Sequence, residues 1–335
     1  MVDDAGMRKV AVLSPSRAAP AMGPAVHEQA MRRLREEFGL VPVEYPTTRT
    51  PDSTPEDRAR DIMAAFVDPE ITAIFATLGG DDQVTVIPFL DPGLIRANPK
   101  PFFGYSDNTN MLNLLHSLGI PAFHGGNTQV QIGAGPELDD VLRTSLTAAL
   151  TGGGLIEVTD PGQSEDHGIR WSDPLALSEN GLRESTPPWR WAGAARKVSG
   201  RTWGGCLEVI TQMSLADRMP GVADLAGGVL MIEASARLTN THGIMEIVRA
   251  LGEADVLGAV QGVMMARPPA RSLFLPDHRD RDEIYDAVIE QVGLYNPEAV
   301  VVCGVPFGHT RPQWVLPYGG TVVLDGVEQR VFADY

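Results

Sequence analysis

The chain has few cysteines and no long apolar segment, and these two absences narrow its class. Its 335 residues include only two cysteines, Cys206 and Cys303, without CxxC spacing, so we expect no disulfide framework and a reducing compartment. No apolar run approaches the roughly 20 residues that a membrane-spanning helix needs. The N-terminus, Met1-Val2-Asp3-Asp4, is acidic where a secretory signal is basic and then apolar. We therefore predict a cytoplasmic protein without membrane association.

Positive charge is also scarce. The chain has 27 Lys and Arg against 43 Asp and Glu, a net charge of −16, and a chain of this charge repels polyanions. Arg32, Arg33 and Arg35 lie close together but are followed directly by Glu36 and Glu37, which is typical of a solvated helix face. We expect no nucleic-acid partner.

The first half of the chain alternates between short apolar runs and helical patterns. With 335 residues, of which 43% are hydrophobic, the chain is long enough for two domains with buried cores. Alternation of strands and helices predicts an α/β fold, with a Rossmann-like parallel sheet flanked by helices. The expected strands are 9–13, 73–78 and 101–105, and the expected helices are 27–38, 58–66, 84–90 and 109–118.

The composition changes between about residues 155 and 205, where prolines, tryptophans and polar residues gather. We predict an N-terminal α/β domain over 1–165, a linker and substrate loop over 166–200, and a C-terminal α/β domain with a β-rich end over 201–335. In the C-terminal domain the expected strands are 229–232, 259–265, 299–303 and 321–324, and the expected helices are 242–251 and 281–292.

A serine follows one of the apolar runs of the first half. Gly104-Tyr105-Ser106-Asp107 leads from a predicted strand into a predicted helix, which is the layout of a nucleophile elbow. Such a turn exposes the serine hydroxyl, and the N–H of Asp107 is placed to bind an oxyanion. The pattern differs from G-x-S-x-G, since Asn108 replaces the final glycine. The alternative is that Ser106 or Asp107 caps the next helix.

Two adjacent glycines end another strand of the same half. Gly79 and Gly80 allow backbone amides to approach a ligand closely, so the Gly80 N–H is a candidate second oxyanion donor. The alternative is an ordinary turn in which Asp81 or Asp82 caps the next helix. No histidine stands near these aspartates at ligand spacing, so we predict no metal site, and no G-x-G-x-x-G or P-loop spacing indicates a nucleotide cofactor.

An acid and a histidine end strands of the second half. Glu233 closes a strongly apolar strand, where a buried carboxylate needs a partner. His309 follows another strand through a loop of glycine and proline that holds its ring at the sheet edge. His124 is a rival, since it also follows an apolar run and precedes glycines, whereas His27 lacks the second histidine of an HExxH helix because Met31 stands in its place.

These segments occur together in an order that resembles the LD-carboxypeptidase family of serine peptidases, in particular its microcin C self-immunity branch. The resemblance spans nearly the whole chain, and an ordered set of motifs is more specific than any one of them. The motifs are Gly79-Gly80-Asp81-Asp82, Gly104-Tyr105-Ser106-Asp107, Trp203-Gly204-Gly205-Cys206-Leu207, Met231-Ile232-Glu233-Ala234-Ser235, Gly308-His309-Thr310 and Leu316-Pro317-Tyr318-Gly319.

The resemblance implies a Ser-Glu-His triad of Ser106, Glu233 and His309, with oxyanion donors at the backbone N–H groups of Gly80 and Asp107. It also implies two α/β domains with the site between them, no cofactor, and a homodimer. Candidate substrate contacts are Gly79, Asp81, Trp189 and Trp203. The family pattern often has Asn where this chain has Cys206, and a more acidic stretch where it has Ala234-Ser235-Ala236; both departures concern the choice of substrate.

Two substrates fit a hydrolase of this kind. One is a peptidyl- or aminoacyl-nucleotide of the microcin C type, and the other is a murein peptide that ends in a D-amino acid. A third hypothesis is a non-catalytic module that binds a nucleotide or sugar at its Gly-rich turns, including Gly79-Gly80 and Gly125-Gly126.

Overall fold

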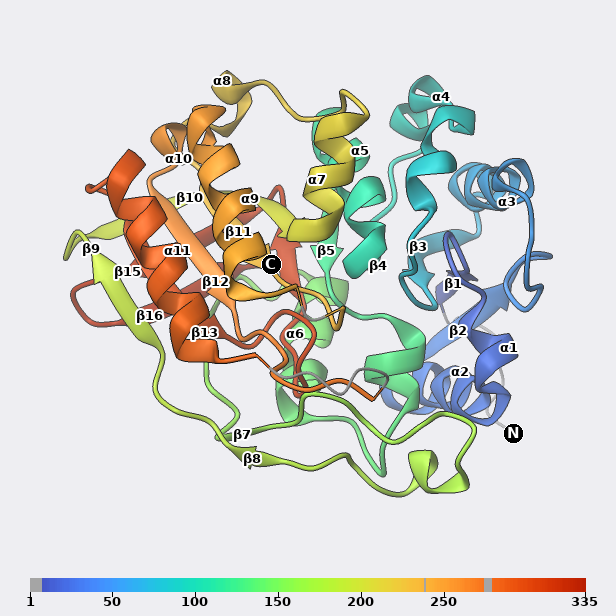
Figure 1. Cartoon of the computed structure of the whole chain (residues 1–335). Coiled ribbons are helices and arrows are strands. Elements are labelled where there is room, and N and C mark those ends of the chain that lie inside the picture. Colours follow the sequence, from blue (N-terminus) through green and yellow to red (C-terminus); the bar gives the residue numbers. More distant parts are fainter. Residues whose placement is uncertain (1–7, 238, 274–278) are drawn as a thin grey trace. The chain divides into compact units, whose positions relative to one another are not determined.

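The computed structural model describes residues 8–237, 239–273 and 279–335, shown in Figure 1. The chain forms two compact units. Unit 1 contains residues 1–138 and 168–180, and unit 2 contains residues 139–167 and 181–335. The acidic N-terminus, on which the prediction of an absent secretory signal depended, lies outside the described residues.

Unit 1 is built on a parallel sheet, as the alternation of strands and helices predicts. Its strands are β1 (Arg8–Leu13), β2 (Leu40–Glu44), β3 (Ile71–Ala76), β4 (Phe102–Gly104) and β5 (Ala122–His124), in the order β5-β4-β3-β1-β2. The order reverses between β1 and β3. In open α/β sheets, ligands bind beyond the carboxyl ends of the strands at such a switch point. The Gly79-Gly80 turn follows β3, and Ser106 follows the adjacent β4.

Stacked aromatic rings hold the strands that lead to these two turns. Phe75 on β3, Phe103 on β4 and Phe123 on β5 form a ladder, with ring centroids 4.5 Å apart for the first pair and 4.8 Å apart for the second. Cross-strand aromatic pairs stabilise a sheet beyond the area they bury. The ladder therefore fixes the register of β3 and β4 just before the turns at Gly79 and Ser106.

The helices of unit 1 mostly match the helical patterns of the sequence. Gly39 and Gly119 end α2 and α5 with φ of 62° and 69°, the left-handed conformation that glycine adopts at low cost. The predicted helix 84–90 is wrong: two 3₁₀ turns occur instead, because Pro88 lacks the N–H that would continue a helix. The helical segments are α1 (Ala19–Met22), α2 (Pro24–Phe38), α3 (Pro55–Val67), α4 (Pro92–Ala97) and α5 (Thr109–Leu118), the 3₁₀ turns η1 (Gln83–Thr85), η2 (Ile87–Phe89), η3 (Ser106–Asn108) and η5 (Pro174–Leu177), and the π-helix η4 (Thr128–Gly133).

Unit 2 contains a larger, mixed sheet, as expected for an α/β domain with a β-rich end. Its strands are ordered β6-β16-β15-β10-β11-β12-β13-β9, and the central four, β10 to β13, are parallel. The strands are β6 (Leu155–Val158), β9 (Arg190–Gly193), β10 (Lys197–Cys206), β11 (Val229–Glu233), β12 (Gly262–Ala266), β13 (Val300–Val305), β15 (Thr321–Asp325) and β16 (Arg330–Asp334). Outside this sheet, β7 (Gln163–Ser164) pairs with β8 (Glu184–Ser185), and β14 (Leu316–Tyr318) precedes β15.

Part of the predicted substrate loop is a strand. Trp191 lies on β9, which pairs antiparallel with β13 at the edge of the sheet, opposite Val302. The loop prediction for this residue is wrong because the pairing partner lies more than a hundred residues away in sequence. Prolines and tryptophans in this segment gave no alternating pattern to reveal the strand.

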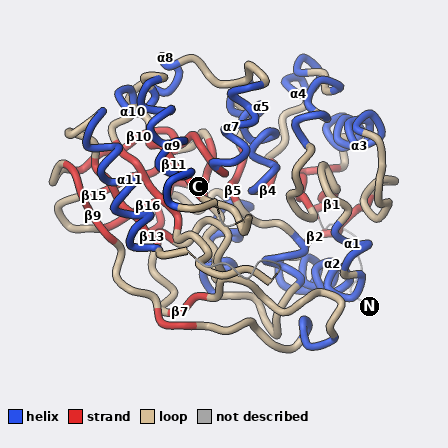
Figure 2. The backbone as a smooth tube through the Cα atoms, in the orientation of Figure 1, coloured by secondary structure: helices blue, strands red, loops and turns tan. Residues whose placement is uncertain are grey.

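Helices cover the parallel strands of unit 2. Figures 1 and 2 show α9 and α11 side by side, and α9 buries Ile244, Val248 and Leu251 at helical spacing. The helices are α6 (Asp140–Thr151), α7 (Leu207–Leu215), α8 (Val222–Leu225), α9 (Thr241–Glu253), α10 (Val256–Ala259) and α11 (Arg281–Tyr295). Across the described ranges, no helix combines the length and the apolar character that a membrane crossing requires.

Candidate active site

Ser106 occupies a strained turn between β4 and α5. Its φ is 64°, whereas the preceding Tyr105 is extended with φ of −154°. A left-handed conformation is costly for a residue with a Cβ, and it is typical of a nucleophile elbow, where a sharp strand-to-helix turn presents the serine. Asn108 is the residue that precedes α5, and its side chain makes no cap to the helix. The backbone therefore turns sharply at Ser106, between the end of β4 and the start of α5.

The carboxylate of Asp107 holds the neighbouring turns of unit 1 in place. It is buried, and its Oδ2 accepts hydrogen bonds from Ser16 Oγ at 2.6 Å and from the backbone N–H groups of Asp82 at 3.0 Å and Gln83 at 2.9 Å. Burial raises the pKa of Asp107, and the hydrogen bonds from Ser16 and Gln83 offset part of that rise. The side chain thus ties the ends of β1, β3 and β4 together instead of capping α5.

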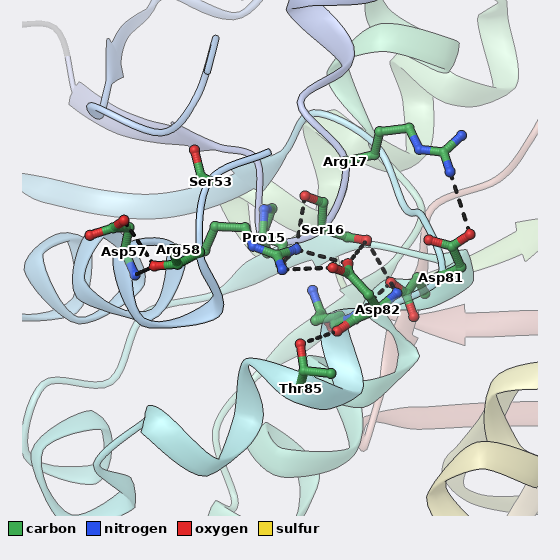
Figure 3. Close-up of polar contacts among 12 residues, drawn as sticks. Pro15, Ser16, Arg17, Ser53, Asp57, Arg58, Asp81, Asp82 and Thr85 are labelled. Atoms are coloured by element: carbon green, nitrogen blue, oxygen red, sulfur yellow. Dashed lines mark hydrogen bonds and ion pairs between the residues drawn. The ribbon is translucent and has the colours of Figure 1, made fainter. Parts of the chain in front are cut away.

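An arginine reinforces the same junction (Figure 3). Arg58 is buried on α3 and forms a two-pronged ion pair with Asp82, with Nη1···Oδ1 2.8 Å and Nη2···Oδ2 2.7 Å. The guanidinium also donates to the carbonyl of Ser16 at 3.0 Å. This arginine is the first cause of the lowered pKa of Asp82. Paired donors of this kind fix geometry more firmly than a single hydrogen bond.

The two glycines after β3 lie against the elbow. A Cβ on Gly79 would stand 2.8 Å from the Cβ and 3.0 Å from the Oγ of Ser106, and a Cβ on Gly80 would stand 2.0 Å from Ser16 Oγ. The Gly80 N–H donates no hydrogen bond within the described residues. The N–H of Asp107 lies in the first turn of η3, where helical N–H groups lack a partner in their own helix. Both predicted oxyanion donors therefore belong to one junction of unit 1.

We predict that Gly79→Ala lowers turnover by about 10²-fold or more, because the new methyl group displaces the Ser106 side chain and a misplacement of about 1 Å has effects of this size. Steady-state kinetics on an amide substrate measure the loss. Gly293→Ala is the matched control, since a Cβ on Gly293 in α11 meets nothing within 4 Å. The control should keep full activity and gain about 0.5–1 kcal/mol of stability. Full activity of Gly79→Ala would contradict the placement of Ser106.

In unit 2, His309 forms a close pair with the buried Glu233. The distance from His309 Nδ1 to Glu233 Oε2 is 2.6 Å, and Glu233 has no exposed surface. Gly308 permits the approach, since a Cβ there would stand 2.9 Å from the Cβ of Ala266 and 3.0 Å from that of Glu233. Gln313 braces the loop, donating to the carbonyls of Phe307 at 2.7 Å and Gly308 at 2.6 Å. With Nδ1 engaged by the carboxylate, Nε2 of the neutral ring is the nitrogen that can accept a proton.

A second carboxylate, which is partly buried and which no sequence motif indicated, supports this pair. Glu208 accepts from the backbone N–H of Ser235 at 3.2 Å, from Ser235 Oγ at 2.8 Å and from Thr239 Oγ1 at 2.7 Å, and Cys206 Sγ lies 3.1 Å away. It thereby fixes the segment that follows Glu233. Burial raises the pKa of Glu208, but these hydrogen bonds outweigh it and hold the pKa below the ordinary value.

The pKa of His309 lies above its ordinary value. Burial alone lowers it, but the carboxylate of Glu233 outweighs burial by charge and hydrogen bonding, and the charge of Glu208 adds to the rise. A raised pKa means that the protonated imidazole is favoured, so the ring is suited to accept a proton from a nucleophile.

Two family models match this chain over separate segments. The model of the LD-carboxypeptidase N-terminal domain matches residues 10–125, and that of the LD-carboxypeptidase C-terminal domain matches residues 199–324. The chain belongs to the LD-carboxypeptidase family. The family predicted from the sequence is thus confirmed, and the chain is a peptidase of this family. Ser106 falls within the first matched segment, and Glu233 and His309 fall within the second.

Members of this family are similar to the chain over most of its length. The microcin C7 self-immunity protein MccF of Escherichia coli is 29% identical over 277 residues, covering 81% of this chain and 76% of MccF. The murein tetrapeptide carboxypeptidase of Pseudomonas aeruginosa is 27% identical over 328 residues, covering 95% of this chain and 93% of the relative. A solved structure of MccF with glutamyl sulfamoyl guanosine has a TM-score of 0.84 at 24% identity, covering 98% and 96% of the two chains, which confirms the two-domain α/β fold.

The remaining predicted site residues of this family member have varied surroundings. Asp81 is exposed and forms an ion pair with Arg17 at 3.4 Å (Figure 3). Trp203 is 2% exposed within β10, where packing is its evident use. Trp189 is partly exposed, and its Nε1 donates to Asp160 at 3.1 Å. His124, the rival histidine, is buried at the end of β5 with its ring 5.7 Å from that of Tyr105.

The raised pKa of His309 makes a prediction for the pH profile of this peptidase. A general base must be neutral, so kcat/KM should fall as the pH drops through a pKa above 6.5, the ordinary value. Because the charge of Glu208 stabilises the imidazolium, Glu208→Gln should move this acid limb to lower pH, which stopped-assay pH profiles measure. Glu246→Gln, an exposed carboxylate on α9, is the control and should leave the limb unchanged. An unmoved limb in Glu208→Gln would contradict the coupling.

Proposed function

We propose that the protein is a serine carboxypeptidase or amidase that acts through a triad of Ser106, His309 and Glu233. His309 Nε2 takes the proton of the Ser106 hydroxyl, the serine oxygen attacks an amide carbonyl, and the amine leaves with that proton. Water then hydrolyses the acyl-enzyme with His309 as base. Glu233 orients the ring and stabilises the imidazolium. The domains of the proposal are those predicted from the sequence, 1–165 and 201–335, which contribute the serine and the acid-base pair respectively.

The observation that carries the proposal is the contact of 2.6 Å between His309 Nδ1 and Oε2 of the buried Glu233. A carboxylate in this position fixes the tautomer in which Nε2 can act as base. The φ of 64° at Ser106 supports its role as nucleophile, because strained backbone conformations of this kind are concentrated at active sites. Within the proposal, the N–H groups of Gly80 and Asp107 bind the oxyanion.

The first substrate candidate is a peptidyl- or aminoacyl-nucleotide, detoxified by cleavage of its amide link. It is supported by the similarity to MccF, whose solved structures include complexes with glutamyl sulfamoyl guanosine and aspartyl sulfamoyl adenosine. A murein tetrapeptide is the second candidate. It is supported by the similarity to the murein tetrapeptide carboxypeptidase, which covers more of this chain than the similarity to MccF does.

Incubation with each substrate, followed by mass spectrometry of the products, tests the proposal. Release of the amino acid or peptide from an aminoacyl sulfamoyl nucleoside supports the first substrate, and release of the terminal D-amino acid from a tetrapeptide supports the second. A fluorophosphonate probe that labels Ser106 argues against the third hypothesis, a non-catalytic binding module. Tight ligand binding with neither turnover nor labelling would reject the hydrolase.

The proposal extends to assembly and location. We expect a homodimer, which light scattering on the purified chain measures, and a cytoplasmic enzyme without a bound cofactor or metal.

A further inference from the structure

One buried arginine, at the carboxyl end of β12 in unit 2, lacks a partner for its charge among the described residues. Arg267 directly follows β12, is 5% exposed, and its Nε has no hydrogen-bond acceptor. Within the described residues its side chain forms neither a hydrogen bond nor an ion pair. Burial lowers the pKa of Arg267, and the nearby charge of Arg281 lowers it further. A buried cation without a counter-charge is costly and is seldom retained for stability alone.

The arginines that follow Arg267 in sequence are all engaged. Arg271 and Arg281 both form ion pairs with Asp166. Arg279, which is equally buried, donates to the carbonyls of Pro269 at 3.0 Å, Thr239 at 3.1 Å and Ser235 at 2.8 Å. The lack of a partner at Arg267 is therefore not a general feature of this segment.

A tyrosine without a partner lies close to Arg267. Tyr285 on α11 is 3% exposed, and its hydroxyl has no hydrogen-bond partner in the part of the chain that the structure describes. The charge of Arg267 acts on this hydroxyl. A Cβ on Gly304 would stand 3.5 Å from the Tyr285 hydroxyl and 3.5 Å from Cδ1 of Trp189. Tyr285 and Trp189 therefore both lie beside Gly304 on β13. The backbone N–H of Arg267 donates to the carbonyl of Val305, the residue after Gly304, at 2.9 Å.

The acids near this cluster are engaged elsewhere. Asp160 and Asp166 lie close enough to act on the charge of Arg267, but Asp160 accepts from Trp189 Nε1 at 3.1 Å and from the N–H of Gly162 at 2.6 Å. Asp166 is shared by Arg271 and Arg281. In the described part of the chain, the Arg267 guanidinium and the Tyr285 hydroxyl are buried donors without an acceptor. Such donors match the oxygens of a carboxylate or a phosphate.

We propose that Arg267 and Tyr285, with Trp189 beside them, form a subsite that binds an anionic oxygen group of the substrate, either a terminal carboxylate or a phosphate. The subsite adjoins the acid-base pair, because Arg267 follows Ala266, whose Cβ lies against Gly308 in the loop that carries His309. The inference deepens the proposed function and rests on it for the identity of the ligand. Under this proposal, Trp189 contacts the substrate because it lies beside the anion subsite.

Binding of two matched ligand pairs tests the subsite. Calorimetry on Ser106→Ala protein compares a murein tetrapeptide that has a free terminal carboxylate with its terminal amide, and AMP with adenosine. Arg267→Met and Tyr285→Phe are the test variants, and Arg267→Lys retains the charge. Arg330→Met is the control, since Arg330 pairs with exposed Glu157 on the far strands of the sheet. Because binding requires no turnover, the result is separate from that of the activity assays.

We expect Arg267→Met to weaken one charged ligand about 10- to 100-fold and to leave its neutral counterpart unchanged, with a smaller loss in Tyr285→Phe and partial recovery in Arg267→Lys. Loss confined to the tetrapeptide assigns a carboxylate, and loss confined to AMP assigns a phosphate. The melting temperature of Arg267→Met should not fall, since no partner is left unpaired. Equal losses for charged and neutral ligands, or no loss for either, would overturn the subsite even if the enzyme hydrolyses both substrates.

Discussion

Replacement of Ser106 by alanine is expected to lower turnover by about 10⁴- to 10⁶-fold while the protein stays folded, because the variant has no nucleophile to form the acyl-enzyme. Steady-state kinetics and a melting curve measure the two effects. Ser117→Ala is the matched control: this serine lies on α5, is exposed, and donates to the carbonyl of Leu114 in its own helix. Activity of Ser106→Ala within tenfold of wild type would reject the nucleophile.

The same position offers a test of the strained turn. Alanine keeps the Cβ that makes a φ of 64° costly, whereas glycine does not. Ser106→Gly should therefore be at least as stable as Ser106→Ala, although glycine usually destabilises a folded protein relative to alanine. Thermal unfolding of the two inactive variants decides this without any substrate. A clearly lower melting temperature for the glycine variant would argue against strain at the elbow.

Glu233→Gln is expected to lower kcat by about 10⁴-fold, the size of effect that a wrong histidine tautomer causes in a serine peptidase. A glutamine amide that donates to Nδ1 leaves the proton on Nε2, and His309 can then no longer accept the proton of Ser106. The pKa of His309 should fall at the same time, because its largest favourable partner has lost its charge. Kinetics measure the first effect, and NMR titration of the imidazole measures the second.

His124 provides the discriminating comparison for Glu233→Gln. If His309 is the base, His309→Ala should match Glu233→Gln in its loss of activity, and His124→Gln should retain far more activity than either. The reverse order, with His124 essential and His309 dispensable, would transfer the role of base to β5. His124 is buried and the side chain of His309 is 13% exposed, so either substitution can change stability. A melting curve is therefore measured for each variant beside its kinetics.

Much of the fold could be predicted from local patterns in the sequence. The strands that end near Gly79, Ser106 and Glu233 are mostly apolar runs, and the helix after Ser106 ends at Gly119, as its pattern indicates. Elements that depend on a distant partner were missed. The strand that carries Trp191 exists because β13 lies beside it. The error at 84–90 has a local cause instead, since Pro88 within the segment stops a helix and 3₁₀ turns form.

The candidate site divides in the same way. Ser106, Glu233 and His309 were accessible from the sequence because each follows an apolar run at the end of a strand, and their order resembles one family. Glu208 was not accessible, since a single glutamate at the start of a helix has no distinguishing pattern. Its role as acceptor for Ser235 and Thr239 arises only because α7 and the segment after β11 meet.

The sequence by itself determined the strand ends that carry the candidate site residues, the glycines that allow close approach and the family, because these depend on residues adjacent in the chain. The tertiary structure alone decided which groups within each unit are paired: Asp107 with three donors of neighbouring turns, His309 with Glu233, and Arg267 with no partner among the described residues. Hydrogen bonds and desolvation act over a few ångströms in space whatever the separation in sequence, so only the folded units reveal which polar groups are satisfied and which await a ligand.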